Sequence, residues 1–239
     1  MSKIDKSQFT KTEWKAFKAQ RNYQKYLEQQ KNIQEPLVEN RDSNFCFVLG
    51  NGVSRKSIDP RDLKPFGKIY ACNAIYREFV PDYLIAVDTK MIKEITSNFY
   101  HLHNEVYTNP NRYTREIPQL NLFNPNLGWS SGPSALNLAS DHDNKIIYIL
   151  GFDYVGTGKN NEMVNNIYTG SFNYKKEGER ATYHGNWTRQ TATTIKKHPH
   201  VKYIRVIENI NSFVPDVLIG LENLTHITLE NFKKKFNIK

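Results

Sequence analysis

Short apolar runs alternate with helix-like segments along most of the chain. The runs are rich in β-branched and aromatic residues, which is typical of strands buried inside a sheet. Helical patterns separate several of them, and this alternation predicts a doubly wound α/β fold with a mostly parallel sheet. Strands are predicted at 45–49, 68–72, 83–87, 104–107, 146–150 and 201–206, and helices at 90–98, 135–140, up to 197 and 229–236.

The first predicted strand runs into a glycine-rich turn, Gly50-Asn51-Gly52, with Ser54 just beyond it. Glycine lets the backbone turn sharply and come close to a ligand. Doubly wound folds build phosphate and nucleotide sites at such a turn, at the carboxyl end of the first strand. The alternative is a tight Asn-Gly turn between two strands. The spacing differs from G-x-G-x-x-G, so the dinucleotide fingerprint does not apply.

Three predicted strands end in a polar side chain: Asn51, Asn73 and Asp88. In an open parallel sheet the carboxyl ends of the strands gather around one crevice. An amide can both donate and accept a hydrogen bond, which suits the edge of a base, a ribose or a phosphate. A single Asn after a strand is commonly a turn former, but three polar strand ends in register predict a shared site.

Two further stretches add candidates for the same crevice. Ser130-Ser131-Gly132 precedes the helical run at 135–140, and one of the two serines is predicted to cap that helix. The positive end of the helix favours an anion, although plain capping is the alternative. Asp153 follows the strand at 146–150. The pair Asp141-x-Asp143 precedes that strand and is interpreted as a turn.

The chain divides into an arm and one domain. Residues 1–40 form a basic segment with interleaved aromatic residues, predicted to be a helical arm. It is interpreted either as a helix that packs its aromatics on the body or as an arm that touches a phosphate backbone. Residues 41–239 are predicted to form a single Rossmann-like domain. Its irregular polar stretch, about 155–183, is predicted to be a lid or disordered.

Composition narrows the class of protein. The chain has 239 residues, of which 38% are hydrophobic and 24% charged, which is typical of a globular protein without a membrane span. Cys46 and Cys72 fall in predicted strands, so buried reduced thiols and a cytoplasmic location are expected. The net charge of +9 favours anionic substrates or polyanionic partners, with nucleic acid as one option.

The motifs together resemble glycosyltransferase family 42, the bacterial sialyltransferases. The resemblance is carried by Gly50-Asn51-Gly52-x-Ser54, Cys72-Asn73, Ser130-Ser131-Gly132, Leu150-Gly151-Phe152-Asp153-Tyr154, and a late His184-Gly185. Order and approximate spacing match from about residue 44 to 206. Related domains, including a pterin pyrophosphokinase family, share the Gly-Asn-Gly opening.

The resemblance implies an inverting, metal-independent transfer of a sugar from a nucleotide-sugar donor to a hydroxyl acceptor, with no cofactor. It implies that His184 is the general base, for which its ordinary pKa is suitable. Lid tyrosines would steady the leaving phosphate, and Tyr168, Tyr154 and Tyr174 are the candidates. The implied nucleotide-binding residues are Gly50, Asn51, Gly52, Ser54, Asn73, Asp88, Ser130, Ser131, Gly132 and Asp153.

Two departures from the family leave the donor and the acceptor open. Asp88 stands where the family usually has Asn, so the donor need not be a sialic acid nucleotide. The basic arm lies outside the family pattern, and it suggests an anionic acceptor such as a hydroxymethylated base in DNA as an alternative to a glycan. Two other functions stay open: a pyrophosphokinase that uses ATP and a metal held by Asp88 and Asp153, and a non-catalytic nucleotide- or nucleic-acid-binding module.

Overall fold

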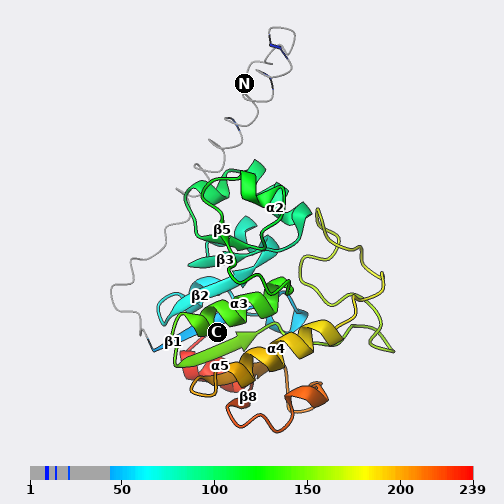
Figure 1. The fold of residues 1–239 in the computed structure, drawn as a ribbon. Coiled ribbons are helices and arrows are strands. Elements are labelled where there is room, and N and C mark those ends of the chain that lie inside the picture. The colour runs from blue at the N-terminus through cyan, green and yellow to red at the C-terminus, as the bar shows by residue number, and fades with distance from the viewer. Residues whose placement is uncertain (1–8, 11–13, 15–20, 22–43, 239) are drawn as a thin grey trace.

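A computed structural model describes residues 9, 10, 14, 21 and 44–238 (Figure 1). The predicted helical arm, 1–40, lies almost entirely outside the described residues. The remainder is one parallel sheet flanked by helices, so the predicted α/β, Rossmann-like fold is confirmed. None of the helices in the described part of the chain is long and apolar enough to cross a membrane.

The sheet has eight strands in the order β5-β4-β3-β2-β1-β6-β7-β8, and all neighbouring pairs are parallel. The strand order therefore reverses direction on either side of β1. The strands are β1 (Phe45–Leu49), β2 (Lys68–Cys72), β3 (Tyr83–Ile85), β4 (Val106–Thr108), β5 (Asn121–Leu122), β6 (Ile146–Leu150), β7 (Lys202–Ile207) and β8 (Leu224–Thr228).

Within the described residues, four α-helices cover the two faces of the sheet (Figure 1). Successive side chains of β1 show how the faces divide: Phe47 and Leu49 pack with α2 and α5, whereas Cys46 and Val48 pack with α3 and α4. This alternation is the two-residue period of a strand buried on both sides. The helices are α2 (Thr89–Ser97), α3 (Ser131–Asp141), α4 (Gly185–Lys197) and α5 (Leu229–Phe236).

The element predictions hold for β1, β2, β6 and α5, whose bounds agree residue for residue. The third strand ends at Ile85, two residues before its predicted end, and β4 lies slightly later than predicted. Neither edge strand, β5 nor β8, was predicted, because β5 has only two residues and β8 is mostly polar, with Thr225 and His226 exposed. Cys46 and Cys72 are buried free thiols, as expected.

Candidate functional site

A large cavity lies at the carboxyl ends of β1, β2 and β6. Its volume is about 700 Å³. Because the strand order reverses between β1 and β6, this is the crevice where open α/β sheets bind ligands. Of the predicted site residues, twelve line it: Gly50, Asn51, Gly52, Asn73, Asp88, Ser130, Ser131, Gly132, Asp153, Tyr154, Tyr174 and His184. Ser54 and Tyr168 do not line it.

Glycines allow the ends of β1 and β6 to meet at the bottom of this cavity. A Cβ atom on Gly50 would lie 2.5 Å from the carbonyl oxygen of Gly151, and one on Gly52 would lie 2.5 Å from the carboxylate carbon of Asp153. Distances this short are not tolerated between unbonded heavy atoms. The Gly-Asn-Gly sequence is therefore a requirement of close packing between two strand ends, and it leaves Asn51 as the side chain between them.

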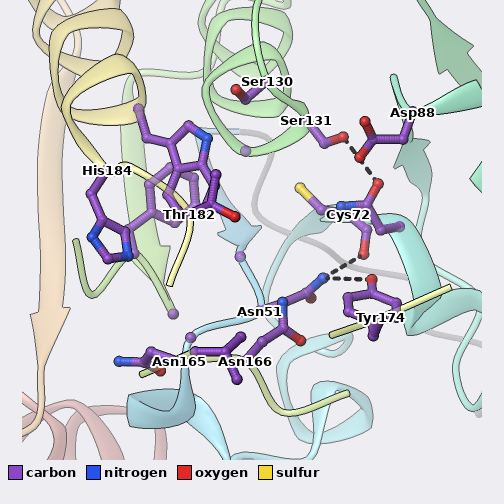
Figure 2. A pocket seen from close by; sticks show the side chains of 18 of the residues that line it. Asn51, Cys72, Asp88, Ser130, Ser131, Asn165, Asn166, Tyr174, Thr182 and His184 are labelled. Carbon is purple, nitrogen blue, oxygen red and sulfur yellow. Dashed lines mark hydrogen bonds between the residues drawn. The ribbon is translucent and has the colours of Figure 1, made fainter. Parts of the chain in front are cut away.

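Asn51 is buried, and its amide is held on both sides (Figure 2). Its Nδ2 donates to the carbonyl of Cys72 and to the phenol oxygen of Tyr174, both at 3.3 Å. Its Oδ1 accepts from Nη2 of Arg55 at 3.4 Å. Arg55 is itself buried, and its Nε donates to the carbonyl of Gly50. Sequence reasoning missed Arg55 because an arginine in a polar turn gives no sign of burial.

The end of β2 is tied to the start of α3. The hydroxyl of Ser131 donates to Oδ1 of Asn73 at 3.0 Å and accepts from the backbone N–H of Val87 at 3.1 Å (Figure 2). Ser130 is the N-cap residue of α3, but its side chain makes no capping hydrogen bond. Ser130 therefore holds the predicted cap position, but the predicted capping hydrogen bond is absent. The Ser131 hydroxyl instead links three chain segments.

The two carboxylates of the cavity have different surroundings. Asp153 accepts from the backbone N–H of Ser54 at 3.1 Å and from the Ser54 hydroxyl, so Ser54 positions this carboxylate from outside the cavity. Asp88 is exposed and occupies the N-cap position of α2, yet its side chain makes no capping hydrogen bond there. An N-cap Asp normally bonds the first turn of its helix. Asp88 instead lines the cavity.

Residues 155–183, the predicted lid, lie between β6 and α4 in the chain (Figure 1), and several of them line the cavity. The backbone N–H of Ile167 donates to the carbonyl of Asn51 at 2.9 Å, and Oδ1 of Asn165 accepts from the backbone N–H of Val53 at 2.8 Å. The lid has no helix or strand of its own, only isolated bridges at Thr157, Met163 and Arg180. Its contacts with the turn after β1 hold it against the site.

The three candidate tyrosines differ in their placement. Tyr174 lines the cavity, and its phenol oxygen accepts from Asn51 and from the backbone N–H of Ala74, both at 3.3 Å. Tyr168 lies outside the cavity lining, and its hydroxyl donates to Glu78. Tyr154 is among the lining residues, but its hydroxyl donates to Thr191 at 2.8 Å within the core. Tyr174 alone of the three has its oxygen beside the strand ends.

A second buried arginine supports the segment after β6. Nε of Arg205 donates to the carbonyl of Phe152 at 3.0 Å, and the guanidinium lies 5.1 Å from the centre of the Tyr154 ring. The same group donates to the carbonyl of Phe213 at 3.1 Å. Burial lowers the pKa of Arg205, whereas the neighbouring Tyr154 and Asp153 oppose that shift. Arg205 therefore fixes the backbone that carries Asp153.

His184 lies at the N-cap position of α4, on the wall of the cavity across from Asp88 and Ser131 (Figure 2). The ring is half-buried and packs edge-on against Trp187, with 5.2 Å between ring centres. Burial lowers the pKa of His184, and the charge of Asp153 acts in the opposite direction. A neutral imidazole at neutral pH can accept a proton.

Comparison with known proteins yields no relative: no family model, no curated protein and no solved structure matches this chain. Within the described residues no group of three or more His, Cys, Asp and Glu side chains is arranged to hold a metal ion. The functional argument therefore rests on the cavity itself.

Proposed function

We propose that this chain is a glycosyltransferase that moves a sugar from a nucleotide-sugar donor to a hydroxyl acceptor. The observation that carries the proposal is one cavity that unites three strand ends, the first turn of α3, a lid tyrosine and a histidine. Its volume of about 700 Å³ is within the range of small-molecule sites. The residues were selected from the resemblance to glycosyltransferase family 42, and their convergence supports that resemblance.

The donor nucleotide lies along the strand ends in this proposal. The first turn of α3, at Ser131 and Gly132, offers backbone N–H groups and the positive end of the helix dipole to a phosphate. Asn51 and Asn73 offer amides to the phosphate, ribose or base. Asp153 accepts hydrogen bonds from ribose hydroxyls or from a base amino group.

His184 acts as the general base. It takes the proton from the acceptor hydroxyl while the acceptor oxygen forms a bond to the anomeric carbon of the sugar. The bond between that carbon and the donor phosphate oxygen breaks, and its electron pair stays on the departing phosphate. Attack from the face opposite the leaving group inverts the anomeric configuration.

Tyr174 stabilises the leaving phosphate. Its oxygen already accepts two N–H hydrogen bonds, which polarise the phenol and strengthen its O–H as a donor. A donor directed at the developing charge lowers the barrier more than it strengthens ground-state binding. Tyr174 takes this role in place of Tyr168, whose hydroxyl is bonded to Glu78 outside the cavity.

A thermal-shift panel tests the proposal. The purified protein is scanned with CMP, CDP, UDP, GDP and ATP, each with and without Mg²⁺. We expect one mono- or diphosphate to raise the melting temperature without metal, and Asn51→Ala to remove that shift. A shift seen with ATP and Mg²⁺ alone would favour pyrophosphoryl transfer with Asp88 and Asp153 as ligands.

Catalysis is tested with the nucleotide sugar of the class that the panel identifies. We expect His184→Ala to retain the thermal shift but to lose at least about 100-fold in donor hydrolysis or transfer at neutral pH. His142→Ala is the matched control, since His142 does not line the cavity and contacts Tyr70. Full activity of His184→Ala would refute the assignment of the base, and binding without turnover would favour a non-catalytic nucleotide-binding module.

A further inference from the structure

A second cavity of about 570 Å³ lies between α2 and the lid. Lys90, Lys93 and Ser97 line it from α2, and Phe172 and Asn173 line it from the lid. Lys90 and Asn173 line the first cavity as well, so the two cavities are adjacent. We call the second cavity the α2 groove. A ligand that lies in this groove is therefore next to the proposed catalytic cavity.

The α2 groove carries uncompensated positive charge. Lys90 and Lys93 are exposed and three residues apart, which places them on one side of α2. Neither forms an ion pair within the described residues; the ammonium group of Lys93 lies 5.5 Å from the centre of the Tyr113 ring. The groove therefore attracts an anion through these two lysines.

The single acid of the groove, Glu94, does not cancel that charge. Its carboxylate pairs with the guanidinium of Arg77 at 2.7 and 2.8 Å. It also accepts from Nδ2 of Asn173 at 2.7 Å and from the hydroxyl of Tyr76 at 2.7 Å. Arg77 and Glu94 neutralise each other, so the two lysines set the sign of the groove.

An exposed aromatic ring stands beside the lysines. Phe172 is 73% exposed, although it belongs to a segment with several fixed contacts. Its carbonyl accepts from Nη2 of Arg77 at 2.7 Å, and the neighbouring Ser171 hydroxyl accepts from Nη1 at 2.9 Å. The backbone under the ring is thus anchored while the ring faces solvent. An anchored, exposed phenyl ring is available for stacking.

We infer that the α2 groove binds single-stranded nucleic acid and delivers it as the acceptor to the catalytic cavity. Lysines that follow a phosphate backbone, combined with an aromatic side chain on which a base stacks, are the features with which proteins hold single strands. A small anion would need the lysines but not the ring. As an assignment of the acceptor the inference rests on the proposed function, whereas strand binding is measurable without it.

The test is fluorescence anisotropy of labelled dT12 with the full-length chain at several salt concentrations. We expect Lys90→Gln/Lys93→Gln to weaken binding at least about tenfold and to reduce the slope of log K against log salt by about 1.4, since each phosphate contact to a single strand contributes roughly 0.7. We expect Phe172→Ala to weaken binding roughly 5- to 150-fold, the range for loss of one stacked base.

The control is Lys202→Gln/Lys235→Gln, which removes the same charge from two exposed lysines at the start of β7 and on α5. It should bind dT12 like the unchanged protein. Equal weakening in this control, or unchanged binding in either groove variant, would overturn the inference. A third result would also overturn it: inorganic polyphosphate displaces labelled dT12 as well as unlabelled dT12 does, and Phe172→Ala has no effect on binding. That result would indicate a surface that binds any polyanion.

A separate readout distinguishes failure of the groove from failure of the proposed transferase. Phe172 lines the groove but not the catalytic cavity, so Phe172→Ala should keep the nucleotide-dependent thermal shift. One outcome is no nucleotide-dependent shift even in the unchanged protein, together with dT12 binding that depends on Lys90, Lys93 and Phe172. That result would support strand binding by the α2 groove and refute the proposed glycosyltransferase. A nucleotide-dependent shift together with dT12 binding that does not depend on the groove would support nucleotide binding by the proposed transferase and refute the inference about the α2 groove.

Discussion

The phenol oxygen of Tyr174 lies 3.3 Å from the side-chain nitrogen of Asn51, and this contact joins the lid to the end of the first strand. The two residues are far apart in the sequence, and no local sequence pattern around either one predicts the contact. Because the same oxygen also accepts from the backbone of Ala74, Tyr174 connects the lid to two strand ends at once.

Tyr174→Phe should loosen the lid. The substitution leaves the N–H groups of Asn51 and Ala74 without their acceptor, and we expect a loss of about 1–2 kcal/mol in the free energy of unfolding. The lid contains Lys175, Lys176 and Arg180, so limited trypsin digestion reports its opening. We expect faster cleavage there. The control is Tyr183→Phe, at a lid tyrosine that is 74% exposed, which should be cleaved like the unchanged protein. Equal cleavage rates in the unchanged protein and both variants would show that Tyr174 does not hold the lid.

Gly52→Ala should damage the site more than the fold. The added methyl group would lie 2.5 Å from the carboxylate of Asp153 and 2.7 Å from the carbonyl of Gly151. Strand ends or carboxylate must move, and we expect a cost of about 1–3 kcal/mol in stability together with at least tenfold weaker nucleotide binding.

Gly67→Ala is the matched control for that substitution. Its methyl group would lie 2.7 Å from the carbonyl of Phe45, a similar clash at the amino ends of β1 and β2. We expect comparable loss of stability in urea unfolding but unchanged nucleotide affinity by calorimetry. Loss of affinity in both variants would mean that the binding defect follows from general destabilisation.

Arg55→Lys should weaken the site through Asn51. Lysine keeps the charge but cannot bond the carbonyl of Gly50 and the amide of Asn51 together with one planar group. We expect about 1–3 kcal/mol less stability and roughly 5- to 20-fold weaker nucleotide binding, because the Asn51 amide loses its orientation. Arg61→Lys, at an exposed arginine paired with Asp59, should change neither quantity; an equal effect at both positions would contradict this role.

The pKa of His184 should depend on Asp153. Burial lowers the pKa of His184 below its ordinary value near 6.5, and the negative charge of Asp153 partly offsets this. The imidazole is therefore neutral above about pH 6.5, and activity should fall only as the pH drops below that value. In Asp153→Asn the offsetting charge is gone, so the pKa should fall further.

NMR titration of the His184 ring measures this directly, with His184→Gln used to assign the signal. The acid limb of kcat/KM should move to lower pH in step with the titration. A pKa that rises in Asp153→Asn, or that stays the same, would show that Asp153 does not act on the ring.

Local sequence determined most of the sheet and the set of polar residues at its edge. The apolar runs of β1, β2 and β6 are buried on both faces, so their composition marks them without help from the rest of the chain. Turn residues directly after such runs must lie at the carboxyl edge. For that reason Asn51, Asn73 and Asp88 were assigned to one crevice, and they line one cavity.

Which of these residues meet, and in which orientation, depended on the tertiary structure. Pairing of β1 with β6 brings Gly50 against Gly151, although about one hundred residues separate them. The lid has no periodic pattern, so its sequence could not distinguish Tyr174 from Tyr168. Ser130 or Ser131 was expected to bond the first turn of α3, but Ser131 bonds Asn73 and Val87 instead. Contacts of this kind form between segments distant in the chain, and local composition carries no information about their partners.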